Sequence, residues 1–184
     1  MGAYVNADGI TFYGKHAQII DKISATNEQL AYDSTLPPLF KRVIDSYYIA
    51  GLIGIVLNEQ SQVDKTIKYK KDIHGGTLST NQRDVNYYSG LSMVFNFDLS
   101  MSANVKEAFF CDEHWYNSAR NDLFYFYALR GLEVIDEYVL KNENGEYLAP
   151  EMRLELYSSL VALLDKLEQN RNLEDTFTEL PELF

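Results

Sequence analysis

The sequence predicts an all-α fold, a single-domain bundle of five to seven helices around a central buried helix. Apolar residues recur at helical spacing through most of the chain, whereas the period-two alternation of strands is nearly absent. Residues 47–57 are eleven consecutive uncharged positions, too few for the roughly 20 that a membrane-spanning helix needs. We therefore expect the surrounding segment, 39–57, to be a helix buried in a protein core.

Turn signals and apolar periodicity place the remaining elements. Glycine-containing turns at 8–9 and 13–14 flank a short β-prone stretch, and a first helix is expected at 15–29. Pro38 suits the first position of the central helix, since it needs no amide donor there. The further helices are expected at 78–99, 104–110, 115–140 and 149–170.

Two of these helices show clear apolar faces. The helix at 115–140 has a predicted buried stripe of Phe124, Tyr127, Leu132, Ile135 and Val139. The last helix has a predicted apolar face of Leu154, Tyr157, Leu160, Val161, Leu164 and Leu167. Small residues predict where helices approach closely. Ala50, Gly51 and Gly54 lie within one turn, where another backbone can come close. Gly131 lowers helix stability by about 1 kcal/mol relative to alanine, so we expect it to allow a close helix approach.

Charge and cysteine content narrow the classes of function. The net charge is −11, with eight basic and seven acidic residues at 1–71 but three basic and ten acidic residues at 143–184. This balance argues against broad wrapping of nucleic acid or anionic membrane. A single cysteine excludes an intrachain disulfide framework, and no signal peptide is visible, so we expect a cytoplasmic protein.

Three patterns resemble chemical motifs, and each has a structural explanation. Gly9 to Lys15 has P-loop spacing, but His16 stands where Ser or Thr would bind Mg²⁺, so turn glycines are the favoured explanation. Residues 111–114 are Cys-Asp-Glu-His, whose adjacent side chains do not face one metal, so an acidic helix cap is favoured. Arg42 and Asp45 have the spacing of a helix-surface ion pair, and a partly buried pair that fixes one packing arrangement is the alternative. We expect no catalytic residue, no cofactor and no metal.

The one basic cluster, at 65–71, is the candidate site for nucleic acid or an acidic partner. It contains Lys65, Lys68, Tyr69, Lys70 and Lys71. The tyrosine could stack on a base while the lysines meet phosphates. A solvated surface segment is the simpler alternative, and the pattern alone leaves both open.

The acidic C-terminal tail, at 172–184, is a second candidate contact. It follows the predicted helical domain at 1–171 and spaces Phe177, Leu180, Leu183 and Phe184 among acidic residues. Such spacing is typical of a short docking segment that binds a partner. Folding back onto its own domain is an equally good explanation.

Three passages carry a resemblance to a known group of proteins: GITFYGKHAQII, LFKRVIDSYYIAGLIGI and YALRGLEVIDEYV. Together they resemble small helical accessory proteins found beside ATPases or nucleases in bacterial antiphage-defence gene clusters. The resemblance implies an accessory subunit and no catalytic residues. We therefore expect a non-enzymatic interaction subunit of a larger complex, with a nucleic-acid-contacting module as the alternative.

Overall fold

The computed structural model describes residues 5–24, 38–96, 119–142, 144–148 and 158–165. Most of these residues are helical, as predicted. The helices are α1 (Gly14–Ile23), α3 (Val43–Leu57), α4 (Gly75–Thr80), α5 (Gln82–Asn96) and α7 (Ala119–Tyr138), and residues 158–165 are also helical. The strands are β1 (Val5–Asn6), β2 (Gly9–Tyr13) and β3 (Lys70–His74).

The three strands correct the purely all-α prediction. They form an antiparallel sheet in the order β1-β2-β3, with Ile10 opposite Ile73. Ile10, Phe12 and Ile73 are buried on the core side of the sheet. β3 was missed because KKDIH has one buried position and pairs with a strand some sixty residues earlier. A sheet this small shows too little alternation to detect locally.

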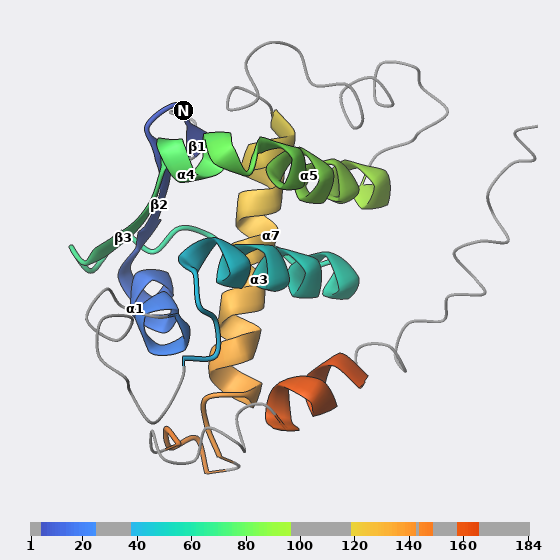
Figure 1. Cartoon of the computed structure of the whole chain (residues 1–184). Coiled ribbons are helices and arrows are strands. Elements are labelled where there is room, and N and C mark those ends of the chain that lie inside the picture. The colour runs from blue at the N-terminus through green and yellow to red at the C-terminus, as the bar shows by residue number, and fades with distance from the viewer. Residues whose placement is uncertain (1–4, 25–37, 97–118, 143, 149–157, 166–184) are drawn as a thin grey trace, which may run out of the picture.

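The core is built where α3 crosses α7, as Figure 1 shows. A Cβ added at Gly131 would lie 1.8 Å from the carbonyl oxygen of Ala50, and one at Gly54 would lie 2.1 Å from that of Tyr127. Only glycine therefore lets the two backbones come this close. The predicted close approach at both glycines is confirmed, and α3 is buried around most of its circumference.

The predicted stripe of α7 is also confirmed, because Phe124, Tyr127, Leu132 and Ile135 are all buried, as is Val139 directly after the helix. α7 lies centrally as well, with α3 and α5 crossing it (Figure 1). The central position predicted for 39–57 alone is thus shared by two helices.

Several helix boundaries differ from the predictions. α1 ends at Ile23, and α3 begins at Val43 rather than at Pro38. The helix expected at 78–99 is two helices that meet at Asn81. Arg42 and Asp45 form the expected exposed ion pair, with 2.5 Å between Nη2 and Oδ1.

The apolar face predicted for the last helix is confirmed at Leu160 and wrong at Val161 and Leu164. Leu163 is 6% exposed and belongs to the core, and Leu160 packs against it. Val161 and Leu164, which the periodicity assigned to the buried face, are 57% and 45% exposed. The helix at 158–165 therefore has apolar residues on its outer face as well as its inner one.

Other predictions lie outside the described residues: the helix expected at 104–110, the Cys-Asp-Glu-His run at 111–114, and the docking tail with Phe177, Leu180, Leu183 and Phe184. Within the described ranges, no helix is both long enough and apolar enough to cross a membrane.

Candidate functional site: a charged network and pocket between α1 and α7

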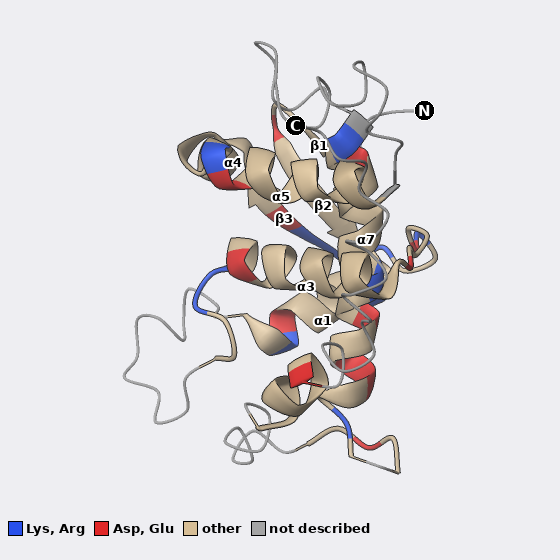
Figure 2. Cartoon of the chain, turned by 90° about the vertical axis from the view of Figure 1, so that its right-hand side faces the viewer, with Lys and Arg blue, Asp and Glu red and all other residues tan. Residues whose placement is uncertain are grey.

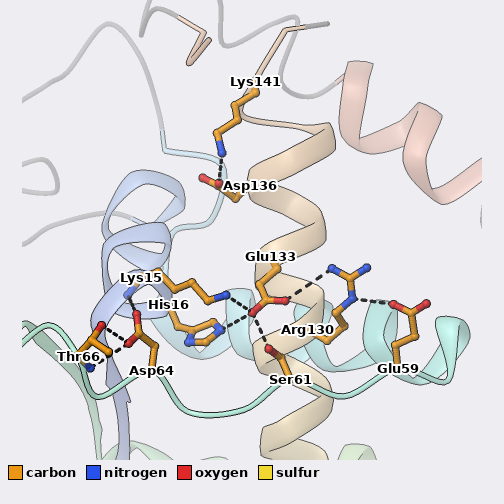
Figure 3. Close-up of polar contacts among 10 residues, drawn as sticks. All are labelled: Lys15, His16, Glu59, Ser61, Asp64, Thr66, Arg130, Glu133, Asp136 and Lys141. Atoms are coloured by element: carbon orange, nitrogen blue, oxygen red, sulfur yellow. Dashed lines mark hydrogen bonds and ion pairs between the residues drawn. The ribbon is translucent and has the colours of Figure 1, made fainter. Parts of the chain in front are cut away.

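A buried histidine joins α1 to α7. Gly14 begins α1 with a φ of +54°, so His16 falls in the first turn, where its side chain is fully buried. Its Nε2 lies 3.0 Å from Oε1 of Glu133 on α7 (Figure 3). The two residues are 117 positions apart in the sequence.

Glu133 is the centre of a polar network (Figure 3). Its Oε1 also accepts hydrogen bonds from Lys15 Nζ at 2.7 Å and Ser61 Oγ at 2.6 Å. Arg130 Nη1 lies 3.6 Å from Oε2. Partial burial raises the pKa of Glu133, but the hydrogen bonds from His16, Lys15 and Ser61 outweigh it and lower the pKa to about 2. Glu133 is therefore ionised at neutral pH.

The direction of the hydrogen bonds in this network determines whether it can activate a nucleophile. An ionised carboxylate only accepts hydrogen bonds, so His16 Nε2 is the donor. In a Ser-His-acid triad the histidine lies between the other two and takes the proton of the serine. Here Ser61 and His16 both donate to Glu133, so the contacts activate no nucleophile. The network instead anchors α1 and the segment after α3 to α7.

A pocket of about 370 Å³ lies beside the network, between α1 and α7. Its charged lining comprises four basic residues, Lys15, Lys22, Arg130 and Lys141, and three acidic residues, Glu133, Asp136 and Glu137. Lys141 Nζ lies 2.5 Å from Asp136 Oδ2, and Lys22 Nζ lies 3.9 Å from the other oxygen of that carboxylate. The ammonium groups of Lys22 and Lys141 thus both lie near the carboxylate of Asp136.

The basic cluster at 65–71 lies at a different place, in the approach to β3 and along its first residues. Lys71 Nζ is 2.6 Å from Asp21 Oδ1, and the Tyr69 hydroxyl also donates to Asp21. This hydrogen bond raises the pKa of Tyr69. Both residues are therefore engaged with α1, which restricts them as contacts for an external ligand.

The other lysines of the cluster stay on the surface. Lys65, Lys68 and Lys70 are exposed, and the Nζ atoms of Lys65 and Lys70 lie 5.6 and 5.2 Å from the ring centroid of Tyr13. On β3 the basic residues are followed at once by Asp72, so opposite charges adjoin there (Figure 2). The structure thus divides the predicted site in two. Tyr69 and Lys71 bind Asp21 of α1, whereas Lys65, Lys68 and Lys70 are exposed.

Most of the stretch with P-loop spacing, from Gly9 to Lys15, belongs to the sheet, and its last two residues begin α1. β2 occupies Gly9–Tyr13 and pairs with β3 along its length, so its amides do not form a phosphate-binding loop. Gly9 and Gly14 have positive φ values, which supports the structural explanation. Among the described residues, no group of three or more His, Cys, Asp or Glu is placed to hold a metal ion.

Sequence reasoning missed the network around Glu133. Its members lie on three segments, and no local spacing connects Lys15, His16 and Ser61 to the carboxylate. The one available signal was the pairing of Arg130 with Glu133 at three residues' distance, which the structure places at 3.6 Å.

Comparisons of the chain with protein-family models, with curated proteins and with solved structures find no match.

Proposed function

We propose that this protein is a non-enzymatic accessory subunit that binds a larger protein through the outer face of the helix at 158–165. The observation that carries the proposal is the exposure of Val161 and Leu164 on a helix already packed through Leu160 and Leu163. An antiphage-defence complex containing an ATPase or nuclease is the setting that the resemblance implies.

The apolar residues on both the inner and the outer face of this helix support a contact with another protein. Burying a fully exposed valine or leucine side chain contributes roughly 1.5–3 kcal/mol. Val161 and Leu164 are 57% and 45% exposed, so a partner that covers both gains a part of that free energy at each. Residues three apart lie on one face of a helix, as anchors do when a helix docks into a groove. A shallow hollow of about 430 Å³, bordered by Val161 and Ala162, lies along the same face.

The state of Glu133 also argues against an acid-base role. A general acid or base works best with a pKa near the operating pH, and the pKa of Glu133 is about 2. Its hydrogen bonds instead hold α1, Ser61 and α7 in one arrangement, which is a structural role.

The experiment is affinity purification from the native host with a matched pair of variants. Val161→Glu/Leu164→Glu places two charges on the proposed face, and we expect it to lose a stoichiometric partner that the wild type retains. Gln62→Glu/Tyr87→Glu adds the same charge at exposed positions elsewhere and should retain it. Equal retention by both variants, or loss by both, would contradict the proposed face.

A second candidate function is nucleic-acid contact through Lys65, Lys68 and Lys70. The observation that favours it is the exposure of these lysines around Tyr13, whose ring two of them flank. Each phosphate contact contributes a salt-dependent term through counterion release.

If this candidate is right, single-stranded DNA binds the protein with an affinity that falls as salt rises. Lys70→Gln should reduce the slope of log K against log salt by about 0.7. Lys41→Gln, a control at another exposed lysine, should leave the slope unchanged. Fluorescence anisotropy from 50 to 300 mM salt measures both, and binding without salt dependence would end this candidate.

A further inference from the structure

We propose that the pocket between α1 and α7 binds a small oxyanion, a phosphate or carboxylate group, through Lys22, Gln18 and Arg130. All three residues line the pocket of about 370 Å³, whose size is near the lower end of the roughly 300–1,000 Å³ of ligand sites. The pocket shares no described lining residue with the hollow on the proposed partner-binding face, so each proposal can be tested independently of the other.

Lys22 is the basic residue of the pocket whose ammonium N–H groups can donate hydrogen bonds to a ligand. Its Nζ lies 3.4 Å from the ring centroid of Tyr147, which holds the ammonium in place. Its distance of 3.9 Å to Asp136 Oδ1 is an ion pair but too long for a hydrogen bond. Asp136 instead binds Lys141 through its other oxygen. Within the described part of the chain, the three N–H groups of Lys22 have no acceptor.

Gln18 and Arg130 provide further donors around the same space. Gln18 lies one turn before Lys22 on α1, so both side chains project from one face of that helix. Arg130 donates through Nε to Glu59 at 2.7 Å, and its Nη1 is 3.6 Å from Glu133. A guanidinium has five N–H donors in a planar fork that suits oxyanions, so Arg130 retains donors for a ligand.

The charge of the lining favours an anion over a cation. Four basic side chains face three acidic ones, in a chain whose net charge is −11. Lys22 and Lys141 both lie against the single carboxylate of Asp136, so two ammonium groups share one carboxylate there. The neighbouring carboxylates repel large polyanions, so the complementary ligand carries one or two negative charges.

The test is a thermal-shift and calorimetric titration of the full-length protein with sodium phosphate and with sodium succinate. Sodium chloride at matched ionic strength is the reference. We expect a saturable rise in Tm with phosphate, with succinate or with both, and none with chloride, because a ligand that binds only the folded state stabilises it. The pair of responses distinguishes a phosphate ligand from a carboxylate ligand.

Two variants localise the binding. Lys22→Gln and Gln18→Ala each remove a donor from a surface position, and we expect Lys22→Gln to weaken the affinity about tenfold. Lys68→Gln removes the same charge outside the pocket and should bind as the wild type does. No saturable response to either anion would overturn the proposal, and so would equal weakening by Lys22→Gln and Lys68→Gln.

Discussion

Gly131→Ala is expected to destabilise the protein by about 3 kcal/mol, the upper end of the usual cost of overpacking a core. Ala is normally the better helix former by about 1 kcal/mol, so propensity alone predicts the opposite sign. The added Cβ would meet the Ala50 carbonyl oxygen at 1.8 Å, and both groups belong to the backbones of packed helices. Neither α3 nor α7 can yield without disturbing the core, which is the costly form of overpacking.

Urea unfolding followed by circular dichroism measures this change as a lower midpoint at constant slope. Gly76→Ala is the matched control, because Gly76 is also helical but a Cβ there would meet no heavy atom within 4 Å. We expect this control to be neutral or stabilising by up to about 1 kcal/mol. Equal effects of the two substitutions would show that the helices do not pack through Gly131.

Glu133→Gln is expected to cost about 2 kcal/mol at pH 7, after allowance for the partial exposure of the side chain. The substitution removes the charge that Lys15, His16 and Ser61 share. The folded-state pKa of Glu133, about 2, lies below the ordinary 4.5, so the wild type gains stability from ionisation above pH 4.5. That stability is lost as the pH falls from 4.5 toward 2.

Urea unfolding at pH 7, 4.5 and 3 therefore should show the wild type and Glu133→Gln converging as the pH falls. Glu137→Gln makes the same change in charge at an exposed position on the same helix. We expect it to stay within about 0.5 kcal/mol of the wild type at every pH. A Glu133→Gln deficit that does not depend on pH would show that the carboxylate is not held ionised by the network.

The sequence was sufficient to predict those parts of the fold in which an apolar pattern repeats over many residues. The stripe of α7 from Phe124 to Val139 recurs over four turns, so its inner face could be predicted. Gly54 and Gly131 predicted that helices approach closely at these positions, because only glycine admits another backbone at such a distance. The sequence did not show that α3 and α7 are the two helices that cross there.

The sheet and the outer helix show where that reasoning ends. Ile10 and Ile73 pair across a long sequence separation, and a strand with one buried residue has no detectable period. Val161 and Leu164 have helical apolar spacing whether they face the core or a partner, so spacing alone could not assign the face. The network around Glu133 depends on three segments meeting in space, which no local pattern encodes.

We propose above all that the protein works as a subunit of a larger assembly. The molar mass of the protein purified from its native host, measured by light scattering after size-exclusion chromatography, tests this most directly. We predict a species well above the 21.2 kDa of the chain that contains a second, larger polypeptide in fixed ratio. A single species of 21.2 kDa would contradict the claim.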